Sequence, residues 1–199
     1  MLNRSGRKKV VILGPNDAVS RRPSRIVVAG TSGSGKTTLS ARLGSILGIE
    51  HIEIDSLYHG PDWTPRVTFE QDVKEFIARP AWVTEWQYSV VRDRLVDRAD
   101  LMLWLDLPRR TVMRQIVIRT VRRRLGRTVL WNGNFEPPLH RILFDREHVV
   151  RWAWNTHRMT AARVQRLNMR RPDLTIVRFR SHAEVNRWLA DRLLPAARI

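Results

Sequence analysis

The sequence predicts an α/β protein with a doubly wound, five-stranded parallel sheet and helices on both of its faces. Three observations lead to this prediction. Five short apolar runs alternate with amphipathic segments of helical period, as in parallel sheets with helical connections. A glycine-rich loop motif directly follows the first run and precedes a helical segment. The run at 101–105 is almost wholly apolar, which is typical of a central strand covered on both faces.

The chain of 199 residues, 43% of them hydrophobic, is long enough for one domain with a substantial core. It contains no cysteine, which excludes disulfides and thiolate metal sites and agrees with a reducing cytoplasm. No stretch approaches the roughly 20 apolar residues of a membrane span, and the basic N-terminus lacks the apolar core of a signal peptide. We therefore expect a soluble cytoplasmic protein without a membrane partner.

The order of elements divides the chain into a basic tail, residues 1–24, with a candidate edge strand at 10–13, and one domain, residues 25–199. The predicted strands are 25–30, 49–55, 81–85, 101–105 and 174–179. Helices are predicted from the glycine-rich loop to Gly48, at 69–77 and 90–96, after Pro108, at 145–167 and after Ser181. Two of these helices have candidate capping pairs, Thr68 with Gln71 and Ser181 with Glu184.

The motif after the first predicted strand has the complete G-x-x-x-x-G-K-[ST] pattern of a phosphate loop, Gly30-Thr31-Ser32-Gly33-Ser34-Gly35-Lys36-Thr37. Its glycines allow successive backbone N–H groups to turn toward phosphates. Lys36 is expected to reach the outer phosphates, and Thr37 to bind Mg²⁺. The sequence thus predicts a protein that binds ATP and Mg²⁺. The predicted nucleotide-binding residues are Gly30, Thr31, Ser32, Gly33, Ser34, Gly35, Lys36, Thr37 and Thr38.

The second strong signal is charge. The formal net charge is +17 at pH 7, which attracts nucleotides, nucleic acid and phosphorylated substrates. Between Arg109 and Arg127 the chain has eight arginines and no acid. This run indicates a segment with a function or an anionic partner of its own, and the alternative is that arginine is common throughout the chain.

Acidic residues stand at the predicted carboxyl ends of three strands, where ligands bind in a doubly wound sheet. Phosphoryl transfer needs a group that holds Mg²⁺, a group that orients or deprotonates the acceptor, and cations over the transferring phosphoryl group. Asp55 is the candidate base for an acceptor hydroxyl, and Glu85 is the candidate metal-associated acid, acting through a water. The alternative for Asp55 and Glu85 is a helix cap or a surface salt bridge. Asp106 is a candidate cap for the helix after Pro108.

These residues resemble those of P-loop kinases of adenylate-kinase type, and within them the small topology modulation proteins or adenylate-kinase-like ATPases. The resemblance covers about 25–189. It is carried by the phosphate loop, by Ile-Asp-Ser-Leu-Tyr at 54–58 with Trp63, by Trp82-Val83-Thr84-Glu85 with Tyr88, by Ala99-Asp100 leading to 104–108, and by Leu130-Trp131-Asn132-Gly133-Asn134 with Glu136. It implies an ATP site at the loop, a mobile arginine-bearing lid after the fourth strand, over about 109–144, and a metal-associated acid at the end of the third strand.

Two departures from adenylate kinases bear on the acceptor. Residues 85–88 read Glu-Trp-Gln-Tyr in place of Asp-Gly-Phe-Pro-Arg, which removes an arginine that grips phosphate. Of two expected lid arginines, the first position holds Gln115 and the second Arg119. Both departures argue against adenosine monophosphate as the acceptor. The Asp-x-x-Tyr pattern at 55–58 is similar to that of kinases that phosphorylate a hydroxyl, such as uridine kinase.

The expected function is therefore a kinase that transfers the γ-phosphate of ATP to an unidentified small acceptor, more readily a hydroxyl than adenosine monophosphate. The acceptor is expected between Asp55, Tyr58, Glu85 and residues 132–134, and the expected catalytic residues are Lys36, Asp55, Arg119 and Arg123. The alternative is a nucleic-acid-binding NTPase or polynucleotide kinase whose arginine helix and basic tail follow the phosphate backbone.

Overall fold

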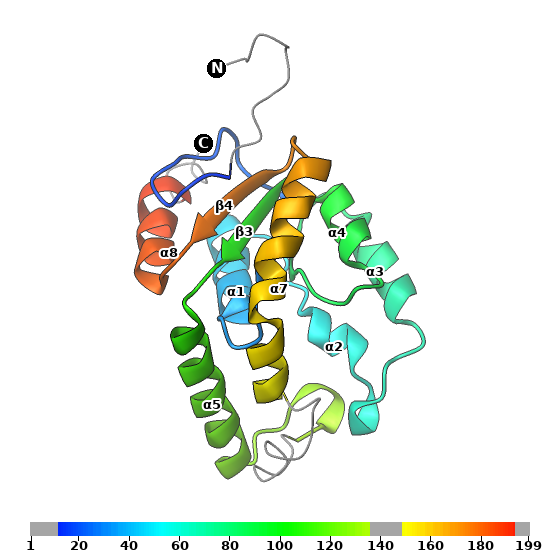
Figure 1. The fold of residues 1–199 in the computed structure, drawn as a ribbon. Coiled ribbons are helices and arrows are strands. Elements are labelled where there is room, and N and C mark those ends of the chain that lie inside the picture. The colour runs from blue at the N-terminus through cyan, green and yellow to red at the C-terminus, as the bar shows by residue number, and fades with distance from the viewer. Residues whose placement is uncertain (1–11, 136–148, 194–199) are drawn as a thin grey trace.

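The computed structural model describes residues 12–135 and 149–193. Its sheet consists of four parallel strands in the order β2-β1-β3-β4 (Figure 1). Their bounds are β1 Arg25–Gly30, β2 Trp82–Glu85, β3 Leu101–Leu105 and β4 Thr175–Phe179. The predicted parallel α/β fold is confirmed, and so, within a residue, are four of the predicted strands.

The remaining predicted strand, the second in chain order at 49–55, is wrong. Only His51 forms a bridge to the sheet, pairing with Val83 of β2. Two backbone hydrogen bonds flank this bridge, from the N–H of Ile52 to the Val83 carbonyl at 2.9 Å and from the N–H of Val83 to the Glu50 carbonyl at 3.0 Å. The chain then turns into helix α2, Ile54–Tyr58, so Asp55 lies in the first turn of a helix and not at a strand end.

The candidate edge strand at 10–13 is reduced, in the described residues, to Leu13. This residue pairs in parallel with Val177 of β4, and its N–H donates to the Ile176 carbonyl at 2.8 Å. Its carbonyl accepts from the N–H of Arg178 at 2.9 Å. The N-terminal segment therefore reaches the β4 edge of the sheet, while residues 1–11 of the predicted tail lie outside the described residues.

The helices follow the predicted order, with bounds α1 Lys36–Leu47, α3 Phe69–Ile77, α4 Arg92–Arg98, α5 Arg109–Leu125, α7 Val149–Arg170 and α8 His182–Trp188. Short turns of helix lie at η1 Pro61–Trp63, η2 Trp131–Gly133 and η3 Leu189–Leu193. Gly48 ends α1 in the left-handed conformation, as predicted. The predicted start of the long helix at 145 lies outside the described residues.

One of the two predicted capping pairs is confirmed. The Ser181 hydroxyl accepts the N–H of Glu184 at 3.2 Å and caps α8. The other prediction is wrong, because Thr68 has helical backbone angles and makes no capping hydrogen bond. Its hydroxyl instead donates to the Asp72 carboxylate at 3.0 Å.

Both faces of the sheet are covered by helices, as predicted. Strand β3 shows why, because its five side chains are all buried and alternate between two cores. On one face lie α3, α4 and α7, and on the other lie α1 and α8 (Figure 1). Because β1 and β2 are parallel, their carboxyl ends lie at the same edge of the sheet, where they position the phosphate loop and Glu85.

Candidate active site

The phosphate loop joins β1 to α1 and depends on its glycines. Gly33 and Gly35 have φ angles of 85° and 90°, in the left-handed region that other residues rarely adopt. A Cβ on Gly33 would lie 2.6 Å from the Ile116 Cβ of α5, and a Cβ on Gly30 would overlap the Ser34 hydroxyl. The loop is thus a backbone cradle beneath α5, open to the N-terminus of α1, which is the geometry that binds phosphate.

The ammonium group of Lys36 is buried in this cradle. Its Nζ donates to the Thr31 carbonyl at 3.3 Å, and among the described residues no carboxylate lies within ion-pair distance of it. Burial lowers the pKa of Lys36 to about 8, and the charge of Arg119 acts in the same direction. Asp55 and Glu85 are near enough to raise it. A buried ammonium group without a carboxylate partner fits the phosphates of ATP.

Asp55 is held by two donors that the sequence did not identify as its partners. Gln87 Nε2 donates to Asp55 Oδ1 at 2.7 Å, and the Tyr88 hydroxyl donates to the same oxygen at 2.6 Å. Burial and the neighbouring Asp55 raise the pKa of Tyr88, so the phenol stays protonated and remains a donor. Tyr58 stacks on Tyr88 with ring centroids 3.9 Å apart. The carboxylate is therefore fixed in orientation, with Oδ2 left for another group.

Tyr88 has a φ angle of 55°, an uncommon value for a residue with a large side chain. In the sequence, Tyr88 was singled out only as part of the motif that begins at Trp82 and includes Glu85. That motif did not indicate its hydrogen bond with Asp55. Gln87 had no signal of its own.

Glu85 is 1% exposed and accepts two hydrogen bonds. His51 Nε2 lies 2.9 Å from Oε1, and the N–H of Ile54 donates to Oε2 at 3.1 Å. Burial alone would raise the pKa of Glu85, but the hydrogen bonds from His51 and Ile54 outweigh it and hold the pKa below its ordinary value. Glu85 is thus a buried carboxylate rather than a surface salt bridge.

The predicted metal residues, Thr37 and Glu85, fit a Mg²⁺ ion that binds together with the phosphates of ATP. Each Glu85 oxygen accepts one hydrogen bond, so each keeps capacity for a further donor or a metal-bound water. Thr37 lies in the first turn of α1, directly after Lys36, and Thr38 beside it is exposed. The described residues contain no cluster of three or more acidic or histidine side chains that could hold a metal ion. Mg²⁺ commonly takes one or two protein ligands, waters and substrate phosphates.

The two predicted catalytic arginines face different surroundings. The charge of Arg119 lowers the pKa of Lys36, so Arg119 lies near that ammonium group. Arg123 lies with its guanidinium 5.8 Å from the ring centroid of Trp131. A contact missed from the sequence lies beside the loop, where Gln115 Nε2 is 2.7 Å from His182 Nε2, and a Cβ on Gly35 would lie 3.3 Å from that histidine ring.

An aromatic cluster, defined as Tyr58, His59, Trp63 and Trp131, adjoins Asp55. His59 and Trp131 stack with centroids 5.8 Å apart, and His59 Nε2 lies 3.2 Å from the Tyr88 hydroxyl. Burial lowers the pKa of His59, which favours the neutral ring.

The Asn134 side chain forms hydrogen bonds with the backbone of the segment that carries His59 and Trp63. Its Oδ1 accepts the N–H of Trp63 at 3.0 Å, and its Nδ2 donates to the Gly60 carbonyl at 2.8 Å. Asn132 Nδ2 donates to the His59 carbonyl. These contacts place the segment 132–134 against the aromatic cluster beside Asp55.

The arginine run forms one helix, α5, that packs on α7 and covers the phosphate loop. Part of its charge is engaged within the protein, because Arg109 lies 3.3 Å from the ring centroid of Trp154 and donates to its carbonyl at 2.7 Å. Asp106 does not cap this helix, since its carboxylate accepts from Arg178 Nε at 2.8 Å and joins β3 to β4. Residues 136–144 of the predicted lid lie outside the described residues.

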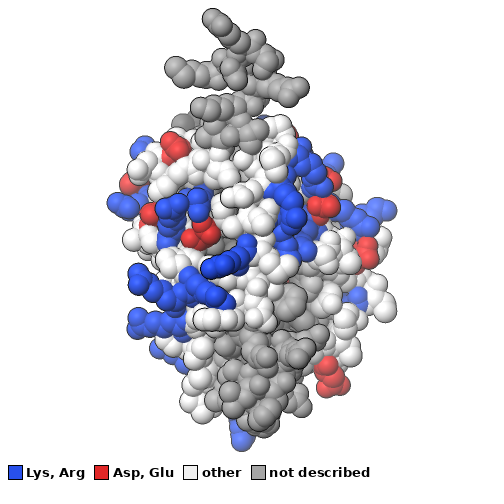
Figure 2. Space-filling view, in the orientation of Figure 1, with Lys and Arg blue, Asp and Glu red and all other residues white. Residues whose placement is uncertain are grey.

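On the face shown in Figure 2, which looks onto α7 and α5, basic side chains cover more of the surface than acidic ones. None of the helices within residues 12–135 and 149–193 combines the length and apolar character of a membrane span.

No family model and no curated protein matches the chain. Among solved structures, it is similar to a gluconokinase from Sinorhizobium meliloti, with 20% sequence identity and a TM-score of 0.39 over 73% of this chain and 98% of that chain. It is also similar to a shikimate kinase from Bacteroides thetaiotaomicron, with 13% identity and a TM-score of 0.46 over 84% and 97% of the two chains. A sugar kinase from Janibacter has 19% identity and a TM-score of 0.46 over 87% and 98%.

Proposed function

We propose that this protein is an ATP-dependent kinase that transfers the γ-phosphate to a hydroxyl group of a small acceptor. One observation carries the proposal. The Asp55 carboxylate, oriented by Gln87 and Tyr88, lies close enough to the buried Lys36 of the phosphate loop to raise its pKa. An oriented carboxylate beside a phosphate-binding lysine is the pair that phosphorylation of a hydroxyl requires.

The loop and α1 form the ATP side of this site. Backbone N–H groups of residues 30–37, the N-terminus of α1 and the Lys36 ammonium group bind the phosphates. Mg²⁺ would be held by the Thr37 hydroxyl, by phosphate oxygens and, through a water, by Glu85. When bound, the ion neutralises charge on the β- and γ-phosphates.

Asp55 and Arg119 act on the transferring group. Asp55 Oδ1 is occupied by its two donors. Oδ2 accepts the proton of the acceptor hydroxyl while the hydroxyl oxygen attacks the γ-phosphorus. The bond between the γ-phosphorus and the bridging oxygen breaks, and ADP leaves. Arg119, near the Lys36 ammonium group, stabilises the charge that spreads over the transferring phosphoryl group.

The acceptor side favours a hydroxyl compound over a nucleoside monophosphate. Gln87 and Tyr88, at the place where adenylate kinases carry a phosphate-gripping arginine, are both committed to Asp55. The aromatic cluster beside them offers ring faces and edges for the apolar face of a small molecule. We therefore expect an acceptor of sugar or nucleoside size, bound through ring contacts with its hydroxyl at Asp55.

The test is ADP release from ATP-Mg²⁺ with a pooled set of nucleosides and sugars. We expect release to be stimulated by this pool, to fall about 10²–10⁴-fold in Asp55→Asn, and to be absent in Lys36→Ala. ATP affinity should be unchanged in Asp55→Asn. The matched control is Asp62→Asn, which makes the same chemical change at an exposed position.

Full turnover in Asp55→Asn would disprove the role given to that carboxylate. Stimulation by single-stranded oligonucleotides alone would replace the small acceptor with a polynucleotide.

A further inference from the structure

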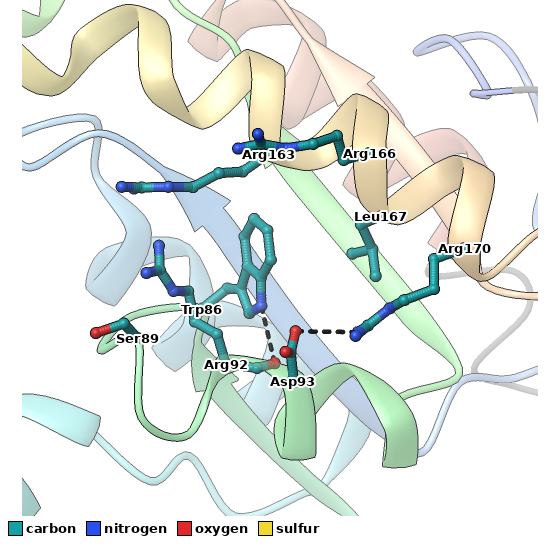
Figure 3. Close-up of a pocket in the computed structure, with 8 residues that line it drawn as sticks. All are labelled: Trp86, Ser89, Arg92, Asp93, Arg163, Arg166, Leu167 and Arg170. Carbon is teal, nitrogen blue, oxygen red and sulfur yellow. Dashed lines mark hydrogen bonds and ion pairs between the residues drawn. The ribbon is translucent and has the colours of Figure 1, made fainter.

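A cavity of about 310 Å³ lies outside the phosphate loop, between α4 and α7 (Figure 3). Its lining has four arginines and a single acid. The residues that matter are Arg92 and Asp93 of α4, Arg163, Arg166 and Arg170 of α7, and Trp86 from the segment after β2. We call this cavity the arginine groove.

The charges of the groove are unevenly matched. Asp93 pairs with Arg170 at 3.0 Å, as Figure 3 shows. Arg170 also lies 3.6 Å from Asp97, which is one helical turn after Asp93 on α4. For Arg92, Arg163 and Arg166, no carboxylate of the described part of the chain lies within ion-pair distance. One end of the groove is therefore neutralised and the other carries an excess of positive charge.

Arg92 and Arg163 come from different helices and lie on the same side of the Trp86 ring (Figure 3). The Trp86 indole donates to the Arg92 carbonyl at 3.1 Å, and the Arg92 guanidinium lies 5.9 Å from the indole ring centroid. Burial lowers the pKa of Arg92, and the charge of Arg163 lowers it further. Two like charges held together in a partly buried site are unfavourable unless an anion joins them.

We propose that the arginine groove binds a small organic phosphate, with its phosphate group between Arg92 and Arg163 and within reach of Arg166. Guanidinium groups match a phosphate dianion in shape and hydrogen bonding. The cavity volume suits a molecule of sugar-phosphate size, whose carbon frame would lie against Trp86 and Leu167.

This site goes beyond the proposed kinase reaction, since none of the groups assigned to that reaction lines the groove. The two sites are nevertheless neighbours in the chain. Trp86 lies between Glu85, which accepts from His51 and Ile54, and Gln87, which donates to Asp55. A ligand on Trp86 therefore contacts the same short segment that orients the proposed base.

The proposal is tested by calorimetric titration of the full chain with ribose 5-phosphate, in the presence of saturating ADP so that the phosphate loop is filled. We expect binding that weakens at least about tenfold in Arg163→Gln and in Arg92→Gln. The matched control is Arg94→Gln, also on α4, because Arg94 pairs with Glu70 at 2.9 Å and does not line the groove. Ribose without phosphate should not bind.

Absence of binding to the wild-type protein would overturn the proposal. So would equal affinity in the wild type and Arg163→Gln, because the phosphate would then bind elsewhere. Citrate binding as tightly as ribose 5-phosphate would refute the assignment to a phosphate. Arg163 is only half-buried, so Arg163→Gln is expected to fold and tests the proposal even if Arg92→Gln does not fold.

Discussion

Lys36 shows how one residue can link ATP binding to pH. Its pKa of about 8, against an ordinary 10.5, follows mainly from burial. The free protein therefore loses the Lys36 proton before the unfolded chain does. Between pH about 8 and 10.5 the unfolded chain binds more protons, so this group makes the free protein more stable as pH rises through that window. ATP has the opposite preference, because its phosphates favour the charged lysine.

We predict that ATP affinity falls as pH rises above about 8, by up to about tenfold per pH unit, because binding must return one proton to Lys36. Titration calorimetry in buffers of different ionisation enthalpy measures both the affinity and the proton taken up. Lys36→Arg is the control, since arginine stays charged over this range and should give a flat profile. Constant affinity and no proton uptake in the wild type would contradict the pKa assigned to this lysine.

At the scale of elements, the phosphate loop and α5 are packed as one unit. Three atoms of α5, the Ile116 Cβ, the Ile116 Cα and the Val112 carbonyl oxygen, lie within 3.3 Å of the place that a Gly33 Cβ would occupy. None of them belongs to a flexible side-chain end. The helix that carries Arg119 is therefore positioned by the loop that binds phosphate, which couples the two halves of the proposed site.

Replacing Gly33 by alanine should consequently move α5 as well as strain the loop. We expect ATP binding to be lost and the free energy of unfolding to fall by more than in Gly48→Ala. Gly48 is the matched control, because it has φ 66° but its Cβ would meet nothing within 4 Å. Gly48→Ala should cost roughly 1–2 kcal/mol and leave ATP affinity unchanged. Urea unfolding and ATP titration of both variants decide this, and normal ATP binding by Gly33→Ala would refute the packing.

At the scale of the whole molecule, contacts that stabilise the fold and the proposed active site lie at opposite ends of the sheet. Asp100 lies directly before β3, at the end of the sheet opposite the phosphate loop, and its side chain is 7% exposed. Its carboxylate accepts from the Ser24 N–H at 3.1 Å, the Ser24 hydroxyl at 2.8 Å and the Arg25 N–H at 3.2 Å. It joins the chain that enters β1 to the chain that enters β3, the two central strands.

Asp100→Ala is expected to lower the free energy of unfolding by about 2–3 kcal/mol, because the donors of Ser24 and Arg25 lose a charged acceptor. ATP affinity of the folded variant should not change. The control is Glu50→Ala, which removes a carboxylate paired with Arg79 at the surface and should cost less than about 1 kcal/mol. Both effects are measured by urea unfolding, and similar losses in the two variants would show that Asp100 contributes no more than a surface pair.

The sequence by itself determined the elements whose signals are local. Four strands, the helix order, the phosphate loop and the Gly48 and Ser181 helix ends were predictable, because apolar period and turn chemistry act between near neighbours. The same local signals wrongly predicted a strand at 49–55, because the conformation of this segment depends on a contact with a residue far along the chain. Glu85 accepts the N–H of Ile54, and the chain enters α2 after a single bridge at His51.

Only the tertiary structure decided which side chains meet. Gln87 and Tyr88 orient Asp55, which lies some 30 residues earlier in the sequence, and Arg92 and Arg163 come from two helices to line one cavity with Trp86. No spacing along the chain encodes such contacts, since they arise from the packing of helices on the sheet. Residue type therefore predicted phosphate chemistry at the loop, while the orientation of the base and the arginine groove depended on how the elements pack.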